Sequence, residues 1–192
     1  MKKLAVFCSG GGTNFQSVID ASEAKTINAK IVALVASKDG IYAIERAKKH
    51  NIPHFVFDKN DYSSLEAMYE KITKQLKGLG VDLIVFAGYL TLATPNFISE
   101  YRNKIVNIHP SLLPKYGGKG FYGKKVHEAV IAAKEQISGC SVHYVDEGAD
   151  TGKILAQKEV PVLPGDTADI LQKRVLGQEH DLLVQVIRDL SM

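Results

Sequence analysis

Short apolar segments alternate with helical patterns along most of this chain, and that alternation limits the possible fold more than any other feature. The segments that predict buried strands are 4–8, 30–36, 54–57, 83–87 and 105–109. Helical spacing follows Asn14, a good N-cap residue, and again follows Ser63 and Glu66, which fit a capping box. A strand–helix–strand series predicts a parallel sheet covered by helices on both faces.

The pattern changes in the last third of the chain. Segments 141–145 and 154–160 are joined by a glycine-containing loop and predict an antiparallel pair at the sheet edge. Apolar residues from 170 to 190 then predict a long final helix, opened by Asp166 and Asp169. No repeat or linker interrupts the chain. We therefore predict one α/β domain over residues 1–192, with a Rossmann-like, mostly parallel sheet and an antiparallel C-terminal edge.

Composition and charge exclude several classes of protein. The formal net charge is only +3 and the basic residues are scattered, so no nucleic-acid partner is expected. Two cysteines cannot form a disulfide framework, and both lie in or beside apolar strand-like runs, where they are expected to stay reduced. The uncharged stretch 83–99 is interrupted by Gly88 and Pro95 and is too short to span a bilayer. These observations predict a cytosolic protein without a membrane segment.

A glycine-rich loop at residues 9–14, Ser-Gly-Gly-Gly-Thr-Asn, leads from the first predicted strand into a helix. Glycines allow backbone amides to approach a ligand, and a helix N-terminus attracts anions, so this loop predicts a phosphate site. No acidic residue occupies 14–19. Phe15 stands where a dinucleotide fingerprint needs its third glycine, and the Gly-Lys-Ser/Thr of a Walker A loop is absent. A tight turn without a ligand is the alternative interpretation.

Polar side chains also gather at the carboxyl end of the fifth predicted strand. Asn107 and His109 point to the same side of that strand, where ligands bind in open α/β sheets. An amide can donate to an oxyanion and an imidazole can move a proton, which suits attack on a carbonyl carbon. The alternative is a histidine with a purely structural hydrogen bond.

The loop 146–152, Asp-Glu-Gly-Ala-Asp-Thr-Gly, supplies carboxylates that could favour an imidazolium. Gly148 and Gly152 would let it fold tightly over a ligand, although acidic glycine loops are also common as solvated turns. The loop lacks the spacing of an EF-hand, and neither His127 nor His143 falls in a zinc-type spacing, so no metal is expected. Ser9 lacks the Gly-x-Ser-x-Gly context of a serine hydrolase.

Three segments together resemble the family of phosphoribosylglycinamide formyltransferases. They are residues 9–16, 107–114 (Asn-Ile-His-Pro-Ser-Leu-Leu-Pro) and 146–152. The resemblance covers essentially the whole chain in order, and the central run is its most specific part. It implies direct transfer of a formyl group, through a tetrahedral intermediate, from 10-formyltetrahydrofolate to the amine of 5-phosphoribosylglycinamide in de novo purine (IMP) biosynthesis.

The resemblance also implies roles for individual residues. The implied catalytic residues are Asn107, His109 and Asp150. The implied phosphate-binding residues are Gly12, Thr13 and Asn14, with Glu179 of the last helix holding the ribose. The residues implied to line the folate pocket are Leu90, Thr91, Leu92, Ala93 and Asn107, with the backbone around Val145 and Asp146 contacting the pterin. The expected oligomeric state is a monomer or a weak homodimer.

Two positions depart from the pattern of the family. Leu65 and Thr91 stand where many members have arginines that face the folate. The basic loop 115–125 could compensate toward an acidic glutamyl tail, although a solvated lysine-rich loop is the simpler interpretation.

Three alternative functions remain open from the sequence. Methionyl-tRNA formyltransferase normally adds a C-terminal domain, and formyltetrahydrofolate hydrolase normally adds an N-terminal one, so the length of the chain argues against both. A non-catalytic module that binds a phosphoribosyl group would keep the glycine-rich loop without the activity.

Overall fold

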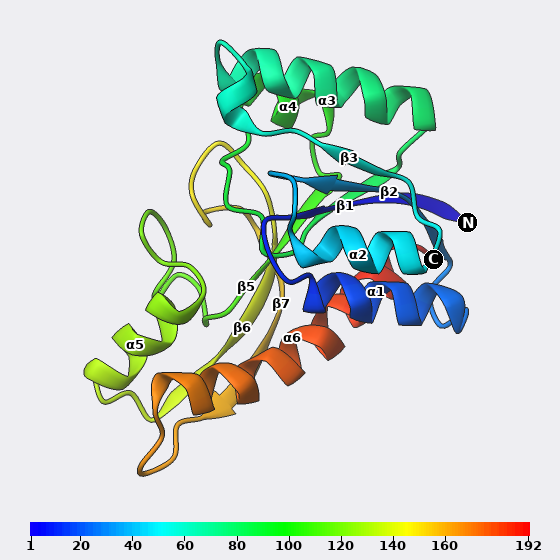
Figure 1. Cartoon of the computed structure of the whole chain (residues 1–192). Helices are drawn as coiled ribbons and strands as arrows, with labels where there is room; N and C mark the ends of the chain where they lie inside the picture. The colour runs from blue at the N-terminus through cyan, green and yellow to red at the C-terminus, as the bar shows by residue number, and fades with distance from the viewer.

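One sheet of seven strands forms the centre of the molecule, in the order β3-β2-β1-β4-β5-β6-β7 (Figure 1). The computed structural model describes all 192 residues. The strands are β1 (Lys2–Cys8), β2 (Ala29–Ala36), β3 (His54–Val56), β4 (Leu83–Phe86), β5 (Ile105–His109), β6 (Ile137–Tyr144) and β7 (Ile154–Pro161). The first five strands pair in parallel, whereas β6 and β7 join antiparallel. The predicted mixed sheet is therefore confirmed, with its antiparallel edge.

Helices cover both faces of this sheet, as the alternating pattern predicted. The helices are α1 (Thr13–Glu23), α2 (Tyr42–Lys49), α3 (Leu65–Leu79), α4 (Pro95–Glu100), α5 (Lys124–Ala132) and α6 (Ala168–Leu190), with a short 3₁₀ turn at Lys59–Asp61. In Figure 1, α1, α2 and α6 lie below the sheet, and α3 and α4 lie above it. No helix of the structure is both long enough and apolar enough to cross a membrane.

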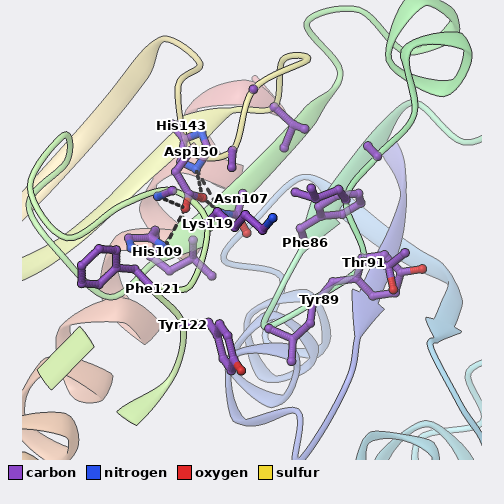
Figure 2. A pocket seen from close by; sticks show the side chains of 18 of the residues that line it. Phe86, Tyr89, Thr91, Asn107, His109, Lys119, Phe121, Tyr122, His143 and Asp150 are labelled. Carbon is purple, nitrogen blue, oxygen red and sulfur yellow. Dashed lines mark hydrogen bonds and ion pairs between the residues drawn. The ribbon is translucent and has the colours of Figure 1, made fainter. Parts of the chain in front are cut away.

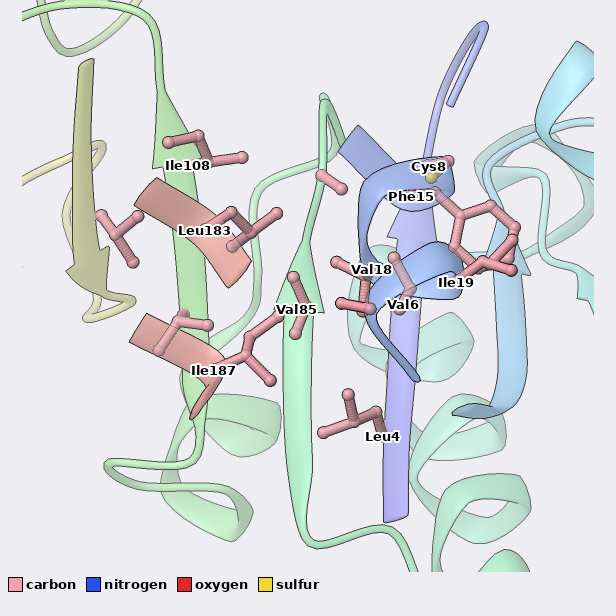
Figure 3. Close-up of a cluster of buried hydrophobic side chains, with 14 of the residues drawn as sticks. Leu4, Val6, Cys8, Phe15, Val18, Ile19, Val85, Ile108, Leu183 and Ile187 are labelled. Atoms are coloured by element: carbon pink, nitrogen blue, oxygen red, sulfur yellow. The ribbon is translucent and has the colours of Figure 1, made fainter. Parts of the chain in front are cut away.

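The side chains of β1 show how the two layers are held. Val6 and Cys8 contribute to a buried cluster that includes Phe15 and Val18 of α1 and Leu183 of α6 (Figure 3). The intervening β1 residues, such as Phe7, face the opposite cluster, which α3 and α4 complete. Each fully buried side chain of this size contributes about 1.5–3 kcal/mol relative to exposure. The alternation of faces along one strand thus fixes helices on both sides.

Two predicted helix starts are wrong. Gly12 caps α1 in the left-handed conformation, with φ 70°, and Asn14 lies within the first turn. The Asn14 side chain instead bonds to Glu179, so a tertiary contact replaces the predicted local one. In α3 the N-cap is Ser64, whose hydroxyl accepts a hydrogen bond from the backbone of Ala67, and the predicted capping box at Ser63 is displaced by one residue.

The final helix also begins later than its acidic residues suggested. Thr167 caps α6 through its side chain, and Asp169 lies in the first turn. Asp166 lies outside the helix, where it pairs with Arg174. The sequence patterns did not predict α2 or α5, and α5 begins within the segment interpreted as a basic loop.

Strands β1 and β4 are neighbours in the sheet. From β1 the chain continues to β2 and β3 on one side, whereas from β4 it continues to β5 on the other, so the strand order reverses between β1 and β4. Ligands of open α/β sheets bind in the crevice at such a reversal, beyond the carboxyl ends of the strands. The glycine-rich loop after β1 and the Asn107–His109 segment of β5 both lie at the carboxyl ends of these central strands.

Candidate active site

A cavity of about 470 Å³ opens beyond the carboxyl ends of β4 and β5 (Figure 2). Its walls are Phe86, the segments 88–93, 107–110 and 118–123, His143, and the segment 145–150. The apolar wall comes from the segment after β4, and the polar end comes from β5 and the loop between β6 and β7. The cavity therefore joins an apolar surface to a cluster of titratable groups.

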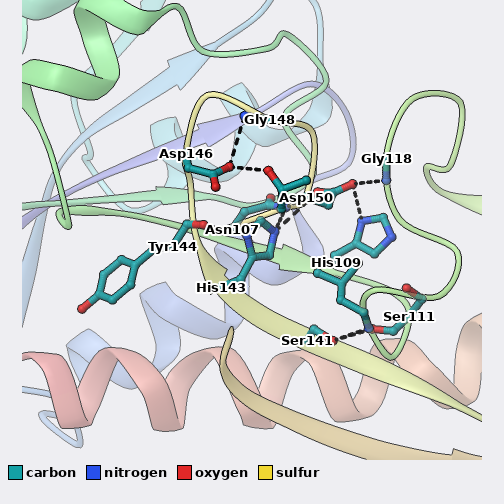
Figure 4. Close-up of polar contacts among 12 residues, drawn as sticks. Asn107, His109, Ser111, Gly118, Ser141, His143, Tyr144, Asp146, Gly148 and Asp150 are labelled. Atoms are coloured by element: carbon teal, nitrogen blue, oxygen red, sulfur yellow. Dashed lines mark hydrogen bonds and ion pairs between the residues drawn. The ribbon is translucent and has the colours of Figure 1, made fainter. Parts of the chain in front are cut away.

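Asn107, His109 and Asp150, the residues that the resemblance implies to be catalytic, meet at the polar end of the cavity (Figure 4). Asn107 Nδ2 donates to Asp150 Oδ1 at 3.3 Å, and His109 Nδ1 lies 3.5 Å from Asp150 Oδ2. Asp150 comes from the loop after β6, and its backbone φ is 58°. Asn107 and His109 of β5 thus both contact the carboxylate of Asp150.

His143 is a fourth member of this cluster that sequence reasoning missed. It pairs directly opposite Asn107 in the β5–β6 ladder. Its Nε2 lies 3.0 Å from Asn107 Nδ2 and 3.4 Å from Asp150 Oδ1, and its Nδ1 lies 2.8 Å from the Tyr144 carbonyl oxygen. From the sequence, His143 is notable only for lacking a zinc-type spacing. No sequence signal pairs His143 with Asn107, because their contact depends on the antiparallel register of β6 on β5.

Burial dominates the titration of His109. Its side chain is only 6% exposed, and burial lowers its pKa below the ordinary histidine value. The Asp150 carboxylate and the Tyr116 carbonyl raise that pKa, but by less, and His143 adds to the lowering. The predicted effect of Asp150 on the imidazole is present in the expected direction, and burial outweighs it.

The Asp150 carboxylate is held in its charged form. Burial by itself would raise its pKa, but hydrogen bonding from His143, the nearby His109 ring and the backbone N–H of Gly118 together lower it. Gly118 N donates to Asp150 Oδ2 at 3.0 Å. The loop before α5 therefore fixes the acid from the side opposite β5.

The tautomer of His109 follows from its partners. Its Nε2 lies 2.8 Å from the Tyr116 carbonyl oxygen, which can only accept, so Nε2 carries a hydrogen in the neutral ring. A second proton must then enter at Nδ1, the atom that faces Asp150. The charged ring and the carboxylate form an ion pair only after that protonation.

The glycine-rich loop forms a second, separate polar site. None of the backbone N–H groups from Gly10 to Phe15 donates a hydrogen bond within the chain. α1 also lacks an acidic residue in its first turn, so the positive end of its dipole is not neutralised. Gly12, Thr13 and Asn14 lie at this end. The loop is therefore able to bind an anion through its backbone.

Glu179 reaches this second site from the middle of α6. Its Oε2 accepts a hydrogen bond of 2.7 Å from Asn14 Nδ2, and both side chains are buried. Burial raises the pKa of Glu179, and the bond from Asn14 opposes that rise. Asn14 Oδ1 has no partner and is buried. The predicted phosphate and ribose residues are thus brought together, outside the walls of the main cavity.

Ser9 joins the two sites. Its backbone N–H donates to the Gly88 carbonyl at 3.1 Å, and its hydroxyl accepts a hydrogen bond of 3.0 Å from the backbone of Leu90. The glycine-rich loop and the apolar wall of the cavity are therefore adjacent and fixed to one another.

The residues predicted to line a folate pocket all lie in the wall of the main cavity. They are Leu90, Thr91, Leu92, Ala93, Asn107, Val145 and Asp146. Leu90 is 60% exposed and Leu92 is 62% exposed, although both are large and apolar. Such side chains at a cavity mouth favour an apolar ligand. Leu65, the other position without the expected arginine, is at the start of α3 and does not line the cavity.

The lysines of the segment 115–125 are mostly engaged elsewhere. Lys115 pairs with Glu135, Lys124 pairs with Asp169, and Lys125 lies against Tyr122. Lys119 lines the cavity and makes no ion pair. Only this lysine is placed to meet an acidic group of a ligand in the cavity.

The chain is similar to known proteins over almost its whole length. A family model described as formyl transferase matches residues 2–187. A phosphoribosylglycinamide formyltransferase of Haemophilus influenzae is 41% identical over 98% of this chain and 86% of its own. A chloroplastic phosphoribosylglycinamide formyltransferase of Vigna unguiculata is 44% identical over 98% of this chain, which spans only 61% of that relative. The crystal structure of glycinamide ribonucleotide transformylase 1 from Geobacillus kaustophilus matches over the full length of both chains, with 44% identity and a TM-score of 0.94.

Proposed function

The chain belongs to the formyl transferase family, and on that premise we propose that it transfers the formyl group of 10-formyltetrahydrofolate to the amine of 5-phosphoribosylglycinamide, a step of purine biosynthesis. The observation that carries the proposal is the adjacency of two unlike sites. A backbone anion site and an apolar cavity are joined through Ser9, and Asn107, His109 and Asp150 lie at the polar end of that cavity.

The two sites would divide the two substrates between them. The glycine-rich loop with Glu179 suits a phosphoribosyl group, because backbone N–H groups bind phosphate and a carboxylate accepts from ribose hydroxyls. The cavity walls at 88–93 and 145–147 suit a flat heteroaromatic ring with polar edges. The amine of one substrate then faces the formyl carbon of the other beside Asn107 and His109.

The reaction proceeds by direct attack. The substrate amine forms a bond to the formyl carbon, and the formyl oxygen becomes an oxyanion. Protonated His109 stabilises that charge, and Asn107 donates to it in exchange for one of its two present hydrogen bonds. The bond from the formyl carbon to the folate nitrogen then breaks. Protonated His109 donates its proton to that nitrogen, the neutral ring then accepts the proton that the amine loses, and Asp150 balances the imidazolium charge.

No enzyme side chain is expected to carry the formyl group. Both cysteines are buried and lie outside the cavity, and burial raises the pKa of each to about 12, so neither forms the reactive thiolate. Ser111 donates its hydroxyl hydrogen to the Lys115 carbonyl and has no adjacent base. Direct transfer without a covalent intermediate follows.

The test supplies both substrates to the purified protein and follows the products by mass spectrometry. Formylated phosphoribosylglycinamide is the expected product. Free formate without formylated product would identify a hydrolase, and binding without turnover would identify a non-catalytic module. A formylated side chain that forms and decays at the rate of turnover would contradict direct transfer.

We also propose that residues 1–192 act as one catalytic domain, as a monomer or a weak homodimer in the cytosol. The two free, buried thiols support a reducing compartment. Light scattering over a range of protein concentrations measures the oligomeric state, and a stable higher oligomer would contradict this part of the proposal.

A further inference from the structure

Helix α2 holds the glycine-rich loop from behind. The backbone N–H of Ala43 donates to the Gly10 carbonyl at 3.2 Å, and Arg46 Nε donates to the Gly11 carbonyl at 2.8 Å. Gly12 lies so close to α2 that a Cβ on it would come within 2.8 Å of the Ala43 Cβ. Two successive carbonyl groups of the loop are therefore bound by one helix.

The direction of these carbonyls fixes the direction of the next N–H groups. In a trans peptide the C=O of one residue and the N–H of the following residue point opposite ways. Because the Gly10 and Gly11 carbonyls face α2, the N–H groups of Gly11 and Gly12 face away from it. Neither N–H has an acceptor within the chain. The contacts with α2 thus aim two free donors at the anion site.

Arg46 brings a positive charge that no carboxylate neutralises. Its Nη1 donates to Gln16 Oε1 at 3.0 Å, its guanidinium lies 5.0 Å from the centre of the Tyr42 ring, and it makes no ion pair. The nearest acids on α1 have other partners, since Gln16 donates to Asp20 and His50 pairs with Glu23. The charge reaches the end of β1, where Arg46 opposes the raised pKa of Cys8.

We propose that Arg46 is a positioning residue for the substrate phosphate: it orients the Gly11–Gly12 peptide through the Gly11 carbonyl and adds an unpaired cation behind the anion site. The inference rests on the proposed function for the identity of the substrate. Binding of a phosphate group by this loop is the part that can be measured without turnover.

The experiment compares Arg46→Met and Arg46→Lys with Lys48→Met as the matched control. Lys48 is on the same helix, is exposed and pairs with Glu45, so its loss removes the same charge away from the loop. Inorganic phosphate is titrated into each ¹⁵N-labelled protein, and the amide resonances of Gly11 and Gly12 are followed. Losing one charge-assisted hydrogen bond and its cation should weaken phosphate binding about tenfold or more in Arg46→Met. Lys48→Met should bind phosphate as the parent protein does.

Steady-state kinetics supply the second measurement. In Arg46→Met the KM for phosphoribosylglycinamide should rise about tenfold or more, while kcat and the KM for the formylfolate stay unchanged. With the riboside that lacks the phosphate, parent and variant should have the same kcat/KM. Arg46→Lys keeps the charge, but an ammonium group cannot bond to both the Gly11 carbonyl and Gln16 as the planar guanidinium does. Its KM for phosphoribosylglycinamide should therefore lie between those of the parent protein and Arg46→Met.

An unchanged phosphate affinity in Arg46→Met would overturn the inference. So would an equal rise of KM for both substrates, because that pattern reports a general disturbance of the fold. If Arg46→Met does not fold, Arg46→Lys decides the question by the same two criteria. If the parent protein transfers no formyl group, the proposed function fails, whereas the phosphate titration still tests Arg46.

Discussion

Gly152→Ala should slow turnover about a hundredfold in a protein that still folds. Gly152 is buried at the end of the loop that carries Asp150, with its Cα against the Tyr144 carbonyl. A Cβ on Gly152 would overlap that carbonyl oxygen and lie 2.8 Å from the carbonyl carbon. The carbonyl carbon and oxygen of Tyr144 belong to the backbone of a paired strand and cannot easily shift. The loop that carries Gly152 must therefore move.

The size of the effect follows from the distances around the acid. Real Cβ atoms essentially never come within 3.0 Å of such a neighbour, so the loop must shift by roughly 1 Å or more in this closely packed region. Asp150 already lies 3.3 Å from Asn107 and 3.5 Å from His109, at the long end of useful contact. A further shift breaks both contacts. Misplacing a catalytic group by about 1 Å typically costs a factor of about 10², or about 2.7 kcal/mol of barrier.

Steady-state kinetics with both substrates measure the loss as a fall in kcat. The KM for phosphoribosylglycinamide should stay unchanged, because the glycine-rich loop does not contact Gly152. Gly78→Ala is the control: Gly78 lies within α3 with open space around its Cα, so the variant should keep its kinetics and gain about 0.5–1 kcal/mol of stability.

A double-mutant cycle with Asp150→Asn decides whether the loss acts through this acid. If Gly152→Ala works by displacing Asp150, it should add little to the loss already caused by Asp150→Asn. Full additivity of the two losses would refute the mechanism. If folded Gly152→Ala has the same kcat as the parent protein, the loop that carries Asp150 does not need to be held in this position.

Three further predictions concern the same cavity and loop. Gly12→Val should raise the KM for the phosphoribosyl substrate far more than that for the folate, since valine is strained at φ 70°; a folded variant with the opposite pattern would show that the loop does not bind phosphate. Because the Asp150 carboxylate raises the pKa of His109, Asp150→Asn should lower that pKa further and move the alkaline limb of the kcat–pH profile to lower pH, and an unchanged profile would contradict this role. Asn107→Ala and His109→Ala should each lower kcat by about 10²–10³. The double variant should lose far less kcat than the product of the two single losses. A loss equal to that product would show that the two residues act independently.

The sheet could be predicted from the sequence because its signals are local. β5 was predicted with its observed bounds, since the run Ile-Val-Asn-Ile-His combines apolar residues with alternation. The same alternation placed Asn107 and His109 on one side, and the rule for ligands at strand ends placed them in a site. Asp150 could be identified only through the resemblance to a family, because nothing local separates it from Asp146 and Glu147.

The contributions of His143 and Arg46 could not be predicted in this way. His143 reaches Asn107 only through the antiparallel register of β6 on β5, and Arg46 reaches Gly11 only through the packing of α2 behind β1. The lowered pKa of His109 likewise depends on burial by distant segments, which outweighs the effect of the nearby carboxylate. Asn14 is the clearest reversal, because its long-range bond to Glu179 replaces the cap that its local sequence favours.

That bond between Asn14 and Glu179 joins residues 165 positions apart. During synthesis the glycine-rich loop leaves the ribosome long before the carboxylate that completes its site, and a contact between distant segments forms only once both are available. A nascent chain therefore lacks part of the proposed phosphoribosyl site until α6 has docked on α1. A substrate that contacts both α1 and α6 will bind only when these two helices are packed together. By mass action it will therefore stabilise the folded domain against unfolding and proteolysis.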